Sequence, residues 1–192
     1  MMSGALGPVE EWLAIQNGSD AVRRELARDI RDACLLHGDF VLSSGVRSNY
    51  YLDKYLFETR PSILRRVARY LAAYIPPECD RIAGPALGAV AIATAVSLET
   101  GLPFVIVKGE AKSYGTAHLI EGELHPGEAV VLLEDVVTSG TQALRAAGKL
   151  QALGARVLSI LAVVDREQGG AEAMSAAGVH YEALFTRADL EG

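Results

Sequence analysis

Residues 130–142 read Val-Val-Leu-Leu-Glu-Asp-Val-Val-Thr-Ser-Gly-Thr-Gln. The apolar start of this stretch predicts a buried strand that ends in two adjacent carboxylates, Glu134 and Asp135. A turn of hydroxyl side chains and glycine then leads into a helix that begins at Thr141. In an open parallel sheet, ligands bind where the strands end and lead into helices. The stretch therefore predicts an α/β fold and also the place of its ligand site.

The side chains of this stretch suit two different parts of a ligand. Backbone N–H groups at the start of a helix, with the hydroxyls of Thr138, Ser139 and Thr141, suit a phosphate dianion. The carboxylates of Glu134 and Asp135 repel phosphate but suit sugar hydroxyls or Mg²⁺, which prefers hard oxygen ligands. Each half alone is typical of an ordinary strand end or of a Ser/Thr helix cap. Together they indicate a site for a sugar phosphate.

Two other kinds of phosphate loop are excluded by the sequence. It contains no GxxxxGK[ST] pattern, which excludes a P-loop kinase. It contains no GxGxxG pattern either, which excludes the dinucleotide-binding fingerprint.

Downstream of Pro77, short apolar runs alternate with helical patterns. The strands are predicted at 81–84, 103–107, 129–133, 156–164 and 181–185, and the helices at 87–100, 141–153 and 171–177. Buried strands that alternate with helices predict a Rossmann-like parallel sheet flanked by helices on both faces. Residues 108–127 have no periodicity and hold four glycines, so we expect a long loop there, with room for a short hairpin of its own.

The N-terminal part has a different pattern, with two helices and a hairpin in place of alternating strands and helices. Apolar residues recur at helical spacing from Ser19 or Asp20, through Leu36, to a stop at Gly38, and a second helix runs from Pro61 to Pro76-Pro77. Two β-type runs within residues 39–57 predict a small hairpin between these helices. We therefore expect a helix and hairpin hood over residues 1–77 and an α/β core over residues 78–192, in one compact domain overall.

Composition limits the classes of partner. The chain has 192 residues and a formal net charge of −6, and half of it is hydrophobic, so it can bury a sizeable core. The acidic balance argues against a nucleic-acid-binding or polybasic membrane-binding protein, but not against a small anionic substrate. The cysteines, Cys34 and Cys79, have no CxxC spacing, which excludes a cysteine zinc cluster and a disulfide scaffold. Together with the lack of a signal-peptide pattern, they predict a cytoplasmic location.

Residues 130–142 resemble the motif by which type I phosphoribosyltransferases bind 5-phosphoribosyl 1-diphosphate (PRPP). Within that group, the chain from about residue 20 to residue 190 resembles the orotate phosphoribosyltransferase family. The stretches that carry the resemblance lie in the same order and spacing: 40–45, 48–53, 83–88, 110–115, 120–122 and 164–166. The resemblance implies the type I phosphoribosyltransferase fold.

The resemblance also implies a reaction: Mg²⁺-dependent transfer of phosphoribosyl from PRPP to N1 of orotate, forming orotidine 5′-monophosphate and pyrophosphate in pyrimidine biosynthesis. It implies that Glu134 and Asp135 bind the ribose hydroxyls and that residues 138–142 hold the 5′-phosphate. The PRPP-binding residues it implies are Lys108, Lys112, Tyr114, Glu134, Asp135, Val136, Val137, Thr138, Ser139, Gly140, Thr141 and Gln142. The orotate-binding residues it implies are Thr138, Arg166 and Tyr51.

A lid and a dimer follow from the same resemblance. Residues 108–120 would close over the neighbouring subunit's site in a homodimer, with Lys112 reaching the pyrophosphate, and Lys112, Glu134 and Asp135 would be the catalytic residues. Mg²⁺ would enter through PRPP, with Glu134 and Asp135 as candidate ligands. No nucleic acid or membrane partner is expected.

The chain departs from the family pattern at several cationic positions. Lys108-Gly109 stands where an Arg-Lys pair is usual, Tyr114 stands in place of a His, and Ser43 and Gly88 each stand in place of a Lys. The missing charge at residues 108–109 lies where the pyrophosphate should bind. Two alternatives therefore stay open: a catalytically weak or inactive relative that senses PRPP or a nucleotide, and a phosphoribosyltransferase for another base.

Overall fold

A six-stranded sheet forms the centre of the molecule. The computed structural model describes residues 20–41, 45, 47–109 and 119–191. The strand order is β5-β4-β3-β6-β7-β8. Five strands are parallel: β3 (Arg81–Pro85), β4 (Phe104–Val107), β6 (Ala129–Val137), β7 (Arg156–Asp165) and β8 (Tyr181–Thr186). The short β5 (Ile120–Glu121) pairs antiparallel with β4 at one edge.

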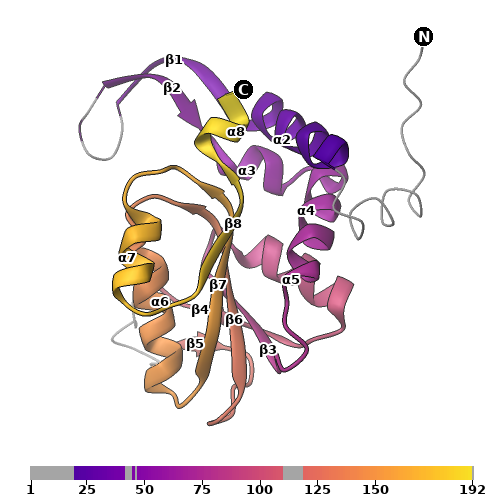
Figure 1. Cartoon of the computed structure of the whole chain (residues 1–192), viewed down its shortest axis with the longest axis vertical. Helices are drawn as coiled ribbons and strands as arrows, with labels where there is room; N and C mark the ends of the chain where they lie inside the picture. Colours follow the sequence, from indigo (N-terminus) through magenta and orange to yellow (C-terminus); the bar gives the residue numbers. More distant parts are fainter. Residues whose placement is uncertain (1–19, 42–44, 46, 110–118, 192) are drawn as a thin grey trace.

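Helices cover both faces of this sheet (Figure 1). One face carries α2 (Asp20–Cys34), α4 (Pro61–Ala73) and α5 (Val90–Thr100), and the other carries α6 (Thr141–Ala152) and α7 (Gly170–Ala176). Neighbouring residues of β6 point to opposite faces, so Leu133 packs in the first of these two cores and Leu132 in the second. The predicted parallel sheet flanked by helices is confirmed.

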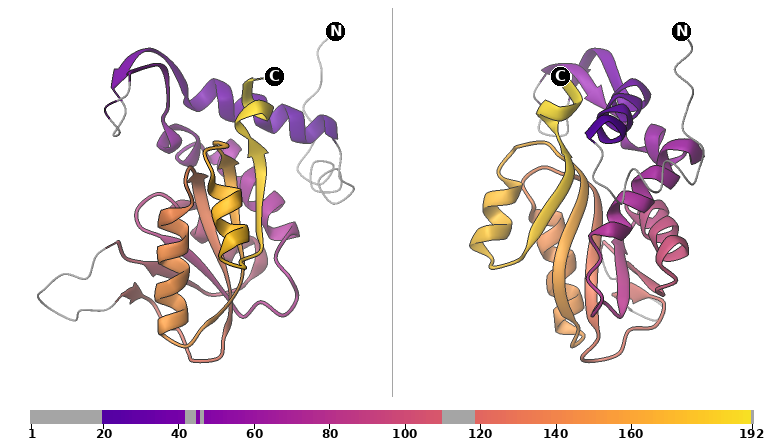
Figure 2. Two further views of the ribbon diagram at one scale, coloured as in Figure 1. Left: turned by 60° about the vertical axis from the view of Figure 1, so that its left-hand side comes forward. Right: turned by 45° about the vertical axis from the view of Figure 1, so that its right-hand side comes forward.

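A small antiparallel hairpin precedes the sheet in the chain. Its strands are β1 (Leu35–Val41) and β2 (Arg47–Leu52), and the short α3 (Lys54–Glu58) follows directly. Asp53 caps α3, because its side chain accepts a hydrogen bond from the Tyr55 backbone N–H at 3.2 Å. Figure 2 shows α2 and the hairpin lying across the end of the sheet at which β6 and β7 finish.

The N-terminal helices share a core with the sheet. Leu26 and Ile30 of α2 belong to the same buried cluster as Leu133, Val163 and Phe185 of the sheet. The last helix, α8 (Arg187–Glu191), lies against α2 at the same end of the molecule (Figure 1). The boundary proposed near residue 77 stays a prediction. Within the described parts of the chain, no helix has both the length and the hydropathy needed to cross a bilayer.

The first predicted helix was too long. It ends at Cys34, and Leu36, which continued its apolar spacing, lies in β1 opposite Tyr51. Strand pairing prevails because β1 meets β2 from its first residue, Leu35, which pairs with Leu52. The helix α3 was not predicted, since its residues Tyr55, Leu56 and Phe57 favour a strand locally.

Three further boundaries differ from the prediction. The strand expected to end at Leu133 continues as β6 to Val137, because its pairing with β7 extends to that residue, so the two carboxylates lie inside the strand. The helix expected from Leu87 begins at Val90, after a turn. The loop expected over residues 108–127, for which a short hairpin was allowed, contains β5 paired with β4, and α8 was not expected.

Candidate active site

The loop between β6 and α6 lies at the carboxyl end of the sheet. Gly140 precedes the first helical residue with a left-handed backbone, at φ 74°. A Cβ there would also lie 3.1 Å from Met174 Cε and 3.2 Å from the Gly170 carbonyl oxygen, so both the backbone angle and the limited space favour glycine. The hydroxyls of Ser139 and Thr141 lie 3.0 Å apart, on either side of Gly140. The start of α6 therefore presents N–H groups and hydroxyls together, as an anion requires.

A second glycine brings the next helix onto this loop. A Cβ on Gly170, the first residue of α7, would lie 2.5 Å from Val137 Cγ1 and 2.7 Å from the Thr138 carbonyl oxygen. The start of α7 therefore packs directly against the loop and fixes its backbone. The predicted loop residues differ in exposure: Ser139, Thr141 and Gln142 are exposed, Val136 and Thr138 half-buried, and Val137 and Gly140 buried.

The two acidic residues before the loop are both buried. They are consecutive residues of β6, and Asp135 is the one that makes contact with α3. The Asp135 carboxylate forms an ion pair with Lys54 of α3, with 2.5 Å between Nζ and Oδ2. Its other oxygen accepts the Val136 backbone N–H, also at 2.5 Å.

Burial perturbs the carboxyl groups around Asp135. Burial, together with the negative charge of Asp135, raises the pKa of Glu134 to about 8. Glu58, at the end of α3, has its pKa raised to about 8 by the same two causes. One oxygen of Glu58 and one of Glu134 have no hydrogen-bond partner within the described structure. Buried acceptors without donors are typical of a site that a ligand completes.

The turn after β3 meets the acidic strand directly. A Cβ built on Gly88 would lie 1.7 Å from Asp135 Oδ2. Gly84 lies against the start of α5, since its Cβ would lie 2.7 Å from the carbonyl oxygen of the N-cap residue Ala89 and 2.8 Å from Ala93 Cβ. Bare glycines therefore let the turn over residues 85–89 lie against the end of β6.

Arg166 lies at the end of the neighbouring strand. Its backbone N–H donates to the Val137 carbonyl at 2.9 Å, which holds the ends of β6 and β7 together. Its side chain lines a small cavity with Leu35 and Leu52, from the base of the hairpin, and with residues of α8. Tyr51, next to Leu52, is 43% exposed and its ring packs against Phe40, 5.6 Å between centroids.

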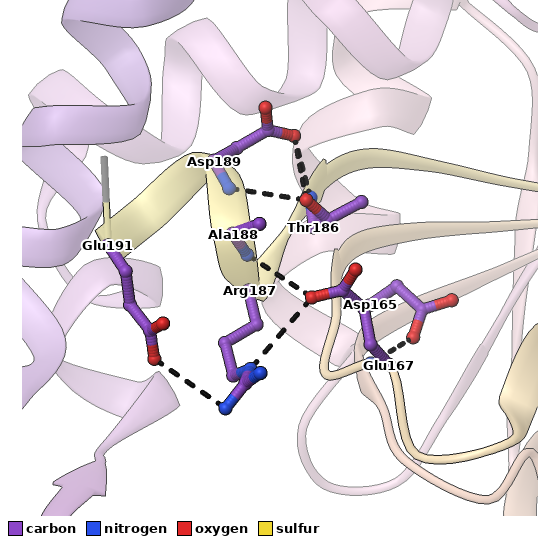
Figure 3. A network of polar contacts seen from close by, with 7 residues as sticks. All are labelled: Asp165, Glu167, Thr186, Arg187, Ala188, Asp189 and Glu191. Carbon is purple, nitrogen blue, oxygen red and sulfur yellow. Dashed lines mark hydrogen bonds and ion pairs between the residues drawn. The ribbon is translucent and has the colours of Figure 1, made fainter.

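Polar contacts fix the chain on either side of Arg166 (Figure 3). Asp165 accepts the Glu167 backbone N–H at 2.7 Å and the Tyr181 hydroxyl at 3.0 Å. Glu167 in turn lies 3.8 Å from the guanidinium of Arg187 and accepts the Ala188 N–H at 3.3 Å. The turn that carries Arg166 is thereby tied to α8.

The predicted lid is described only at its two ends. Lys108 forms an ion pair with Glu121 of β5, 2.8 Å between Nζ and Oε1. Lys149 of α6 donates to the carbonyl oxygens of Lys108, at 2.6 Å, and of Gly109. Lys112 and Tyr114 lie outside the described residues, and nothing about their predicted roles follows from the structure.

Sequence reasoning missed Lys54 and Glu58. Both lie in a run that favours a strand by composition, and each is an ordinary charged residue by itself. Their spacing of four residues was the one available signal, because it puts both on one side of a helix.

No family model matches the chain. It is 48% identical to the orotate phosphoribosyltransferase of Halobacterium salinarum, over 80% of this chain and 87% of that protein. It is 44% identical to the orotate phosphoribosyltransferase of Thermococcus gammatolerans, over 89% of this chain and 92% of that protein. The chain belongs to the orotate phosphoribosyltransferase family. It is therefore a phosphoribosyltransferase, an enzyme that transfers a pentosyl group.

Comparison with solved structures leads to the same family. Mycobacterium tuberculosis orotate phosphoribosyltransferase in complex with Fe(III) dicitrate superposes with a TM-score of 0.79 at 33% identity, covering 88% of this chain and 98% of that one. The same enzyme in complex with PRPP gives a TM-score of 0.74 at 31% identity, covering 88% and 99%. Adenine phosphoribosyltransferase from Leishmania donovani, at 17% identity and a TM-score of 0.65, shares the fold. The expected type I phosphoribosyltransferase fold is confirmed.

Proposed function

We propose that this protein transfers the 5-phosphoribosyl group of PRPP to N1 of orotate in the synthesis of pyrimidine nucleotides. The bond from ribose C1 to the pyrophosphate breaks, a bond from C1 to N1 forms, and the products are orotidine 5′-monophosphate and pyrophosphate. The observation that carries the proposal is the joint placement, at one end of the sheet, of the anion-binding loop, the buried carboxylates and Arg166.

The loop and the acidic strand would hold PRPP. Residues 138–142 present N–H groups and hydroxyls to the 5′-phosphate, at the positive end of the α6 dipole. Val136 and Val137 set the backbone that leads into this loop. Glu134 and Asp135 would accept hydrogen bonds from the ribose hydroxyls, and this would satisfy acceptors that are buried in the free protein.

Orotate would bind beside the end of β7. Arg166 offers a planar guanidinium, which suits the carboxylate of a flat acid. Thr138 would reach the same base from the loop after β6, and Tyr51 would bring an aromatic ring to it from the hairpin. The cavity shared by Arg166, Leu35 and Leu52 supports this assignment, because it brings the hairpin next to Arg166.

Mg²⁺ fits this site as a companion of PRPP. Among the described residues, no group of three or more His, Cys, Asp or Glu side chains could hold a metal ion. The nearby donors, Glu134 and Asp135, are hard oxygens of the type that Mg²⁺ accepts. An ion carried by the pyrophosphate would offset negative charge on the leaving group.

The lid would supply the positively charged side chains that stabilise the leaving pyrophosphate. The transition state resembles an oxocarbenium ion at the ribose, so catalysis requires a stabilised leaving group and a site without water. Lys112 would reach the pyrophosphate, supported by Lys108 and Tyr114. In this proposal the lid serves the neighbouring subunit of a homodimer.

A cytoplasmic location is part of the same proposal. Cys34 and Cys79 are both free thiols and both buried, which suits a reducing compartment. Burial raises the pKa of the Cys34 thiol to about 12, so the group is inert.

A direct assay tests the proposed reaction. Purified protein with PRPP and Mg²⁺ is expected to consume orotate, followed by its absorbance, and to release one pyrophosphate for each orotate. Intact PRPP binding by calorimetry without loss of orotate would contradict the enzyme and favour a sensor. Faster turnover of adenine, guanine or uracil than of orotate would contradict the proposed base.

A further inference from the structure

Lys54 is a cation at the site for which the proposed mechanism has no role. It projects from α3, and its ammonium lies 2.5 Å from Oδ2 of Asp135. The Asp135 side chain is 2% exposed, whereas that of Lys54 is 35% exposed. Lys54 therefore reaches from solvent to the buried carboxylate.

Two further buried carboxyl groups lie close to this contact. Glu58 lies one helical turn after Lys54, and Glu134 adjoins Asp135 in β6. Both are buried, and the charge of Asp135 acts on both. Within the described part of the chain, Lys54 is the cation that forms an ion pair in this group of carboxyls, and its partner is Asp135. Burial lowers the pKa of Lys54, but the hydrogen bond and the charge of Asp135 outweigh burial and leave that pKa above its usual value.

The backbone leaves room for this pair at Gly88. A Cβ on that residue would lie 1.7 Å from Asp135 Oδ2 and 2.6 Å from Lys54 Nζ. The space beside the turn that follows β3 is thus filled by the ion pair. Three elements meet there: α3, the turn after β3, and β6.

On the basis of the proposed function, we propose that Lys54 is a positioning residue for PRPP. Its ammonium holds the Asp135 carboxylate against the Gly88 turn, in the orientation that accepts a hydrogen bond from a ribose hydroxyl. The Val136 N–H holds one oxygen of Asp135, and the ion pair to α3 fixes the other oxygen. Lys54 then acts on PRPP through Asp135, and α3 belongs to the site.

The test compares two ligands on folded protein. Calorimetry measures the Kd of PRPP with Mg²⁺ and the Kd of ribose 5-phosphate, which has ribose hydroxyls but no pyrophosphate. Lys54→Met is expected to raise both Kd values by roughly tenfold or more, as loss of a charged hydrogen bond does. Arg156→Met, an exposed cation at the opposite end of β7, is expected to change neither.

Every outcome of this test is decisive. If only the affinity for PRPP falls, Lys54 contacts the pyrophosphate directly. If neither Kd changes in a variant that melts cooperatively, Lys54 has no role in binding. Either result overturns the proposal. If Lys54→Met does not fold, Lys54→Gln replaces it. This variant keeps a hydrogen-bond donor but loses the positive charge, so we expect the Kd of each ligand to rise by at least about threefold.

A failure of the proposed reaction can be distinguished from a failure of the positioning role of Lys54. If the wild-type protein does not consume orotate, the proposed function is wrong. The positioning role is still decided by the ribose 5-phosphate titration, which requires no turnover.

Discussion

At the residue scale, Gly170 tests whether packing under the loop controls substrate binding. Gly170→Ala places a methyl group 2.7 Å from the Thr138 carbonyl oxygen and 2.5 Å from Val137 Cγ1, so the loop backbone must shift. Misplacement of binding groups by about 1 Å is costly, and we expect kcat/KM for PRPP to fall by at least about tenfold.

The matched control is Gly148→Ala in α6. A Cβ there has open space and adds helix propensity, so activity should be unchanged and unfolding should cost about 0.5–1 kcal/mol more. Equal kinetics for the two variants would show that the loop tolerates the shift.

Also at the residue scale, the missing lid cations can be restored. A side chain at Gly109 has open space, so Lys108→Arg with Gly109→Lys should fold normally and place more positive charge near the pyrophosphate. We expect a higher kcat/KM for PRPP, measured by orotate consumption. If the rate is unchanged, this deficit of charge does not limit catalysis.

At the element scale, one ion pair joins the beginnings of β3 and β6. The Arg81 guanidinium meets both oxygens of Glu128, at 2.7 and 2.8 Å, and this contact lowers the pKa of Glu128 from 4.5 to about 2. A lowered carboxyl pKa stabilises the fold at pH above 4.5, and that stabilisation is lost as the pH falls towards 2.

Glu128→Gln should therefore lower the free energy of unfolding by about 1–2 kcal/mol at pH 7. The gap in Tm from the wild type should close between pH 4.5 and pH 2, as followed by circular dichroism. Glu172→Gln, an exposed position in α7, serves as the control and should show little change. A gap that stays constant over this pH range would exclude the ion pair as its cause.

At the scale of the whole molecule, the N-terminal part covers apolar sheet surface. Leu26 and Ile30 pack in one cluster with Leu133 and Val163, so a fragment of residues 78–192 would expose much of that face to water. We expect this fragment to lack a cooperative thermal transition and to bind a hydrophobic dye. A sharp transition near that of the full chain would instead establish the core as an independent domain.

Sequence alone determined the parallel sheet, the loop over residues 138–142 and the resemblance that the comparisons confirmed, because strand runs, helix periodicity and motif spacing are local properties of the chain. Tertiary structure decided that β6 carries its carboxylates inside the strand, since pairing with β7 extends it to Val137. It also decided that Lys54 meets Asp135 beside Gly88. These residues lie far apart in the sequence, and only the packing of α3 against the end of the sheet brings their charges into contact.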